Sequence, residues 1–224
     1  MPDILIIGAS RGIGLGLAEE FSKRGWNVTA TVRDAAKAPA LKASPNVTVE
    51  TVDIADRQSA AALAERLAGQ SFDAVIINAG ISGPQATPKS VEHDAFADLL
   101  VTNALAPVRL AEMLVKLVKP QTGVIGFMTS QLGSVGGNTG GGMELYRASK
   151  AALNSFTRSF AARHRDKGLS ILSLHPGWVR TDMGGPGADI DVATSTAGLA
   201  DVVEHALGAH QEVYLDYAGK ALPW

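Results

Sequence analysis

Short apolar runs along the chain alternate with longer segments whose apolar residues recur at helical spacing. The run at residues 124–128 is apolar on both faces, which is typical of a central parallel strand covered by helices on both sides. Within residues 28–32 and 47–52, apolar residues alternate with threonine or glutamate, which favours strands nearer a sheet edge. The predicted strands span residues 4–7, 28–32, 47–52, 73–77, 124–128, 169–174 and 212–215.

Three segments between these strands carry the spacing of helices. From Ala60, apolar residues recur at i, i+3, i+4 and i+7, which gives one core-facing stripe. Residues 91–119 are predicted to be mostly helical, with a kink at Pro107 and an end at Pro120. Residues 148–164 form another long predicted helix.

Strands and helices that alternate at this spacing predict βαβ units and a parallel sheet. Because crossovers between parallel strands are right-handed, a doubly wound arrangement follows. We therefore predict an α/β fold: one Rossmann-type domain over residues 1–224, with a doubly wound parallel sheet of about seven strands and helices on both faces. A glycine-rich stretch, residues 133–142, and a second irregular segment, residues 184–191, are predicted site loops at the carboxyl ends of the strands.

Composition narrows the functional classes. Hydrophobic residues make up 46% of the chain, which argues against disorder, and a formal net charge of -2 gives no strong electrostatic footprint for nucleic acid. No dense run of lysine and arginine indicates an anionic membrane surface, and no apolar stretch approaches the ~18 residues of a membrane span. The absence of cysteine excludes disulfides and thiolate sites and, with the lack of a basic leader, favours a cytoplasmic protein.

A glycine-rich turn directly follows the first predicted strand and opens a helix. Gly8, Gly12 and Gly14 permit a tight turn in which backbone N–H groups and the helix dipole face a pyrophosphate. The spacing is G-x-x-x-G-x-G, and no Lys-Ser/Thr pair follows Gly14, so a P-loop is excluded. A plain strand-to-helix turn is the alternative, but the position after the first strand favours a dinucleotide site.

Tyr146 and Lys150 are four residues apart, so on a helix their side chains lie on one face. A free tyrosine has a pKa near ~10, and a neighbouring ammonium lowers it, which suits general acid/base chemistry. Ser130 closes the fifth predicted strand, where its hydroxyl would bind a substrate oxygen. Taken alone, the pair is typical of an amphipathic helix and Ser130 of a turn, and Ser134 is a rival for the serine role.

Together these motifs resemble the short-chain dehydrogenase/reductase family. The resemblance rests on the run from Gly8 to Gly14, Asn78-Ala79-Gly80, Asn103, Ser130, Tyr146-x-x-x-Lys150 and Pro176-Gly177, in the family's order and at near-family spacing. Residues 133–150 and 176–185 are similar to a narrower branch, the C-factor-like and Sniffer-type carbonyl reductases. The family places a further asparagine before Asn78, where this chain has Ile77.

The resemblance implies a catalytic set of Ser130, Tyr146, Lys150 and Asn103. Tyr146 would be the general acid/base, Lys150 would hold the nicotinamide ribose, and Ser130 would bind the substrate oxygen. Asn103 would open the helix hydrogen bonding and hold a water that relays protons to Lys150. An exposed mid-helix asparagine is the alternative for Asn103, which the apolar run at residues 99–105 disfavours.

The resemblance also implies which residues hold a dinucleotide. Asp53 would meet the adenine, although a solvated strand-end acid or a helix cap for Arg57-Gln58 is an alternative for it. The segment that starts at Pro176 would cover the nicotinamide. The implied cofactor residues are Gly8, Ser10, Arg11, Gly12, Ile13, Gly14, Arg33, Asp53, Ile54, Asn78, Ala79, Gly80, Tyr146, Lys150, Pro176, Gly177, Val179 and Thr181.

The end of the second predicted strand favours NADP(H) over NAD(H). NAD-preferring members place an acid there, which binds both ribose hydroxyls and repels a 2′-phosphate. Here Arg33 comes first, and Arg11 would project from the glycine-rich turn toward the same spot, so two guanidiniums would converge on one phosphate. Asp34 would serve the ribose of NAD if the strand ended one residue later.

We therefore predict an NADPH-dependent oxidoreductase that interconverts a small-molecule carbonyl and an alcohol. A non-catalytic NADP(H)-binding sensor or signalling protein is the alternative, and the presence of all four implied catalytic residues argues against it. A sugar-nucleotide epimerase is disfavoured by the glycine spacing and the chain length. The five histidines are scattered without ligand spacing, so no metal is expected.

A homodimer or homotetramer is the predicted assembly. Family members commonly pair the helices after strands four and five across a two-fold axis. In this chain those helices carry Met113, Leu114, Leu117, Leu153, Phe156 and Phe160. This is more apolar surface than one sheet face is expected to cover.

Overall fold

Seven parallel strands form one sheet in the order β3-β2-β1-β4-β5-β6-β7. The computed structural model describes residues 1–224, apart from the side chain of Lys37. The strands are β1 (Asp3–Ile7), β2 (Asn27–Val32), β3 (Val47–Thr51), β4 (Ala74–Ile77), β5 (Val124–Met128), β6 (Ser170–His175) and β7 (Glu212–Asp216). The strand order reverses between β1 and β4, which is where doubly wound sheets bind ligands.

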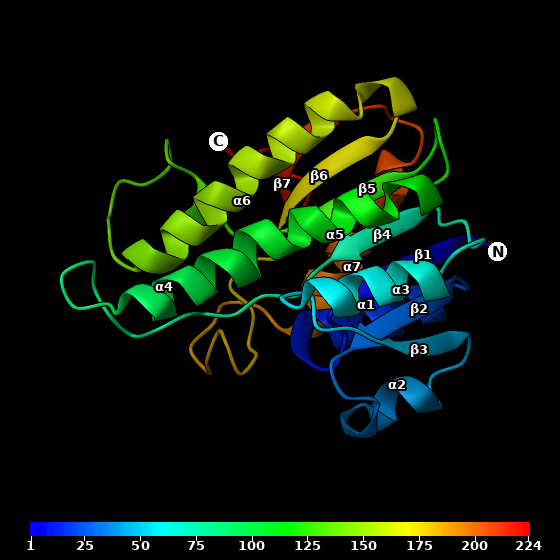
Figure 1. Ribbon diagram of the computed structural model, residues 1–224, viewed down its shortest axis with the longest axis horizontal. Helices are drawn as coiled ribbons and strands as arrows, with labels where there is room; N and C mark the ends of the chain where they lie inside the picture. The colour runs from blue at the N-terminus through cyan, green and yellow to red at the C-terminus, as the bar shows by residue number, and fades with distance from the viewer.

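Helices cover both faces of this sheet, and Figure 1 shows α3, α5 and α6 lying across its front. Leu5 and Ile7 of β1 belong to the core on the α5 and α6 side, and Ile4 and Ile6 belong to the core under α1 and α7. Because both faces are buried, β1 is apolar at consecutive positions, and the predicted α/β fold is confirmed. No helix among the described residues combines the length and apolar character required to cross a membrane. The α-helices are α1 (Gly12–Lys23), α2 (Pro39–Ala43), α3 (Arg57–Arg66), α4 (His93–Leu100), α5 (Ala106–Leu114), α6 (Glu144–Arg163) and α7 (Val192–Ala206); the shorter turns are η1 (Ala35–Lys37), η2 (Val101–Leu105), η3 (Val115–Leu117), η4 (Gln131–Gly133) and η5 (Arg165–Lys167).

The helix predicted over residues 91–119 is interrupted by η2, a single π-helical turn between α4 and α5. The sequence predicts a kink at Pro107, but the distortion lies in the turn that precedes this residue. Pro107 has no N–H to donate to the carbonyl of Asn103, four residues earlier, so regular α-helical bonding fails there. The proline therefore acts on the turn that contains Asn103.

The helix that carries Tyr146 begins earlier than predicted. α6 starts at Glu144 rather than at residue 148, so Tyr146 and Lys150 share one helix. Met143, which precedes the helix, has a left-handed φ of 50° and makes no side-chain cap. Because no serine, threonine, aspartate or asparagine stands at this position, the usual sequence signal for a helix start is absent.

The chain beyond β7 turns back along the outer edge of this strand. The Leu222 N–H donates to the Tyr214 carbonyl at 2.8 Å, and the Trp224 ring packs against the Tyr214 ring with centroids 5.3 Å apart. The Trp224 carbonyl accepts a hydrogen bond from the Gly136 N–H at 3.1 Å. This C-terminal tail, residues 218–224, therefore connects the sheet edge to the glycine-rich loop after β5.

Most of the apolar side chains expected at a subunit interface lie in the core of this chain. Leu114, Leu117, Leu153 and Phe160 are buried, whereas Phe156 is 42% exposed. The surplus of apolar surface is therefore smaller than the sequence predicts. The homodimer or homotetramer stays a prediction.

Candidate active site

Three loops gather at the carboxyl ends of neighbouring strands. The loops after β4, β5 and β6 project from the same end of the sheet, at the left of Figure 1. They carry the segments that begin at Asn78, Ser130 and Pro176. The topology therefore brings together most of the residues that the sequence singles out.

Ser130 lies two residues beyond β5 and caps the N-terminus of the short turn η4. Its Oγ accepts a hydrogen bond from the Leu132 N–H at 3.2 Å, and the side chain is buried. Ser134, the rival serine, is also buried, but its Oγ accepts from the Gly137 N–H at 2.8 Å within the glycine-rich loop. Ser130 is thus the serine nearer to the strand end, and its side chain is hydrogen-bonded to Tyr146.

Tyr146 lies in the first turn of α6, and its phenol is held as a neutral acid. Burial raises the pKa of Tyr146 to about 12, a hydrogen bond with Ser130 lowers it, and the nearby Tyr214 adds to the rise. The sequence predicts a pKa lowered by Lys150, but the lysine Nζ lies 5.8 Å from the centroid of the Tyr146 ring. Desolvation therefore outweighs the lysine charge in this structure.

Lys150 is 4% exposed, and its Nζ donates a hydrogen bond to the Met128 carbonyl at 2.9 Å. Burial lowers the pKa of this ammonium from 10.5 to about 8. A Cβ placed on Gly80 would lie 3.5 Å from the Lys150 Nζ, so the loop after β4 approaches the lysine closely. The loop after β4 and the helix α6 therefore meet at the Lys150 Nζ.

Asn103 is fully buried in η2, which excludes an exposed mid-helix asparagine. Its Oδ1 accepts from the Ile81 N–H at 2.8 Å, and its Nδ2 donates to the Ile81 carbonyl at 2.8 Å and to Ser149 Oγ at 3.1 Å. The Ser149 hydroxyl in turn donates to the Tyr146 carbonyl at 2.8 Å. The asparagine side chain therefore connects the loop after β4 to the helix of Tyr146.

The glycine-rich turn has room for phosphate only because it lacks side chains. A Cβ on Gly14 would lie 2.0 Å from the Gly8 carbonyl, and Gly8 itself has a φ of +88°. Asn78 Nδ2 donates to the Gly8 carbonyl at 2.7 Å, so Asn78 shapes the turn. No side chain caps the N-terminus of α1, so its first N–H groups face outward as an anion site, which fits the pyrophosphate of a dinucleotide.

Among the described residues, Arg11 and Arg33 share no common partner. Arg11 Nη1 lies 2.6 Å from Asp182 Oδ2, so the loop after β6 holds this guanidinium. Arg33 is the first residue after β2 and is exposed, which is the register that the sequence predicts. Asp34 follows as the N-cap of η1, where its carboxylate accepts from the Ala36 N–H at 3.0 Å. The register therefore puts the basic residue, not the acid, at the strand end.

The segment after β6 passes close to the glycine-rich turn. A Cβ on Gly12 would lie 3.3 Å from Thr181 Cγ2, and Val179 is buried. After β3, Asp53 Oδ1 accepts from the Ala55 N–H at 2.9 Å; the cap of α3 is Asp56, so the cap interpretation of Asp53 is wrong.

Three buried polar residues near the site carry no sequence signal. Tyr214 on β7 donates its hydroxyl to the Ser130 carbonyl at 2.5 Å, and Asn154 Nδ2 donates to the Gly133 carbonyl at 3.3 Å. His175 ends β6, and burial lowers its pKa to about 4 while Asp216 opposes the shift. Only the seven-strand arrangement reveals these contacts, because the partners are far apart in sequence.

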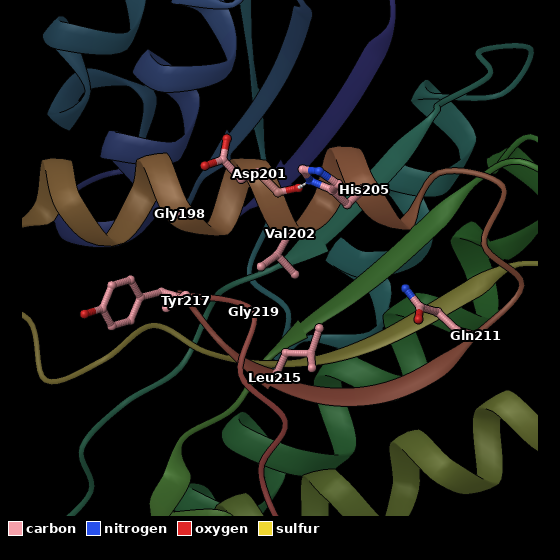
Figure 2. A pocket seen from close by; sticks show the side chains of 9 residues that line it. Gly198, Asp201, Val202, His205, Gln211, Leu215, Tyr217 and Gly219 are labelled. Atoms are coloured by element: carbon pink, nitrogen blue, oxygen red, sulfur yellow. Dashed lines mark hydrogen bonds between the residues drawn. The ribbon is translucent and has the colours of Figure 1, made fainter.

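A surface groove of about 370 Å³ lies elsewhere, between α7 and β7 (Figure 2). Two of its polar residues are already bonded: His205 Nδ1 lies 2.7 Å from the Asp201 carbonyl, and the Asp201 carboxylate binds Arg24 at 2.7 Å. Within the described part of the chain, histidine and acidic side chains form no cluster of three suited to a metal ion. The catalytic candidates lie outside this groove.

Comparison with known proteins agrees with this geometry. A family model described as short chain dehydrogenase matches residues 3–189. The chain belongs to this family. The C-signal protein of Myxococcus xanthus is 39% identical over 153 residues, which cover 68% of this chain and 92% of that protein.

Two solved structures share the whole fold. A short-chain dehydrogenase/reductase from Burkholderia multivorans, crystallised with bound NADP, is 45% identical with a TM-score of 0.94 and covers 100% of this chain and 99% of its own. Carbonyl reductase Sniffer of D. melanogaster is 32% identical with a TM-score of 0.90 and covers 100% of both chains. The predicted resemblance to this branch is confirmed, and the chain is a member of an oxidoreductase family.

Proposed function

We propose that this protein is an NADPH-dependent carbonyl reductase that interconverts a carbonyl and an alcohol. One observation carries the proposal: Tyr146 and Lys150 share α6 beside Ser130, at the carboxyl edge of the sheet. The protonated phenol is the acid that a carbonyl oxygen needs when it becomes an alkoxide. NADP in the related Burkholderia structure and the carbonyl reductase activity named for Sniffer support the cofactor and the reaction class.

NADPH, when bound, supplies the hydride. The pyrophosphate would lie on the turn between Gly8 and Gly14, and Arg33 would bind the 2′-phosphate. Lys150 would hold the nicotinamide ribose. The segment from Pro176 to Thr181 would cover the nicotinamide, where Gly177 with a φ of +85° lets the backbone turn.

Different side chains would bind the substrate oxygen, transfer the proton and stabilise the resulting charge. The Ser130 hydroxyl donates a hydrogen bond to the carbonyl oxygen as negative charge develops there. Tyr146 transfers its proton to that oxygen, and the Lys150 ammonium stabilises the phenolate that remains. Asn103 fixes the α6 turn through Ser149, and its own carbonyl, which Pro107 cannot bond, would hold a water that returns a proton toward Lys150.

The test is NADPH oxidation by the purified protein against a panel of aldehydes and ketones. Tyr146→Phe keeps the ring and removes the proton donor, so NADPH should still bind while turnover falls by about 10²–10⁴. Near-wild-type turnover by this variant would reject Tyr146 as the acid. NADPH binding by the wild type without turnover of any carbonyl would favour a non-catalytic NADP(H)-binding protein instead.

A further inference from the structure

Two side chains outside the catalytic set hold the backbone that carries Ser130. The Ser130 carbonyl accepts from the Gly133 N–H at 2.7 Å, within its own turn, and from the Tyr214 hydroxyl at 2.5 Å. A carbonyl can only accept, so the Tyr214 hydroxyl is the donor. This contact reaches from the last strand of the sheet to the serine after β5.

The surroundings of Tyr214 keep its hydroxyl in that role. The side chain is 2% exposed and packs against Trp224 of the C-terminal tail. Burial raises the pKa of Tyr214 to about 12, and the neighbouring Asn154 amide opposes the rise. The phenol is therefore protonated across the working pH range and remains a donor to Ser130.

Asn154 completes the arrangement from the opposite side. It lies one turn after Lys150 on α6, and its Nδ2 donates to the Gly133 carbonyl at 3.3 Å. A Cβ on Gly133 would lie 2.9 Å from the Lys150 carbonyl carbon, so the Ser130–Gly133 turn rests directly on the lysine backbone. The turn is thus held between β7 and the helix of the catalytic residues.

We infer that Tyr214 is a positioning residue that fixes Ser130 with respect to Tyr146 and Lys150. The inference rests on the proposed function, and Tyr214 lies beyond residues 3–189, where the family match ends. Small displacements of a hydrogen-bonding group in an active site cost large factors in rate. Loss of the Tyr214 hydroxyl leaves the Ser130 carbonyl with its local donor only, so the serine gains freedom while the cofactor site is unchanged.

The experiment is a double-mutant cycle between Tyr214→Phe and Ser130→Ala. Tyr214→Phe alone should lower kcat about tenfold, with the NADPH Kd and the carbonyl KM unchanged. In the Ser130→Ala background the loss should be much smaller, because the serine that it positions is gone and only the direct effect of Tyr214 on the pKa of Tyr146 remains. Tyr217→Phe is the matched control, because it keeps the ring that lies against Gly177 and removes a hydroxyl for which the described residues show no hydrogen bond.

Equal losses of kcat from Tyr214→Phe in both backgrounds would overturn the inference, because they indicate a general structural effect. An unchanged kcat for Tyr214→Phe alone would also overturn it. If Tyr214→Phe fails to fold, Asn154→Ala, which releases the same turn through Gly133, should show the same dependence on Ser130. Failure of the proposed function is distinct: the wild type would then turn over no carbonyl, and Ser130→Ala would change nothing.

Discussion

Arg11 and Asp182 form an ion pair of 2.6 Å that joins the glycine-rich turn to the loop after β6. Both side chains are more than 70% exposed, so the pair adds little to folding stability. Its importance lies in its position, because Arg11 is one of the two residues that the sequence assigns to the 2′-phosphate. While Asp182 holds Arg11, a cofactor phosphate must compete with a carboxylate for the same guanidinium.

Asp182→Asn is therefore expected to raise NADPH affinity by roughly two- to fivefold and to leave NADH affinity unchanged. Fluorescence titration with each cofactor measures the change. Asp189→Asn removes the same charge from the same loop and is the control. Weaker binding of both cofactors by Asp182→Asn would instead mean that the pair closes the loop over the bound dinucleotide.

Arg33→Ala should weaken NADPH binding by about tenfold or more, because a charge-assisted bond to the 2′-phosphate is lost. NADH, which lacks this phosphate, should bind as before. Arg165→Ala, an exposed arginine in η5 at the opposite end of the sheet, controls for net charge. A wild type that prefers NADH would contradict the role of Arg33 and assign cofactor choice to Asp34.

Ser130→Ala should reduce turnover steeply, whereas Ser134→Ala should have little effect. The Ser134 hydroxyl accepts from the Gly137 N–H and therefore belongs to the architecture of the glycine-rich loop. Steady-state kinetics of both variants on one accepted carbonyl decides between them. The opposite order of effects would assign the substrate oxygen to Ser134.

Lys150→Met should stabilise the protein at neutral pH while it abolishes turnover. The folded state depresses the pKa of Lys150 from 10.5 to about 8, so below pH 8 folding retains a charge that burial disfavours. Between about pH 8 and pH 10.5, Lys150 is protonated in the unfolded chain and neutral in the folded protein. The free energy of unfolding of the wild type therefore rises with pH across this window. The stability advantage of the variant should fall by about 2 kcal/mol between about pH 7 and pH 9.5 in chemical denaturation. An advantage that is independent of pH would contradict the assignment.

His175 should make the protein sensitive to acid. Its pKa is about 4 when folded and 6.5 when free, so stability is fully present above pH 6.5 and is lost as pH falls toward 4. At about pH 5 the loss should be roughly 2 kcal/mol, measured by denaturation. His175→Gln should remove this loss, and His93→Gln, at an exposed histidine, should retain it.

Local patterns account for the parts of the fold and site that the sequence predicts. Consecutive apolar positions mark β1 and β5, and the spacing of Tyr146 and Lys150 depends only on one helix. Arg11 and Asp182, by contrast, are 171 residues apart, and no short-range pattern indicates their contact. The pKa of Tyr146 also escapes the sequence, because its direction depends on how deeply the fold buries the ring.

The C-terminal tail covers part of one edge strand of the sheet, β7, while β3 forms the other edge. Lys220 and Leu222 bond to the backbone of Asp216 and Tyr214, so the outer side of β7 already has an antiparallel neighbour from the same chain. An exposed strand edge is where other polypeptides add on and where aggregation starts. The tail therefore covers this edge over residues 214–216, which shortens the stretch of β7 that a foreign strand could join. Tyr214 takes part in both arrangements, because its hydroxyl bonds the Ser130 carbonyl and its own carbonyl accepts from the tail that covers the edge.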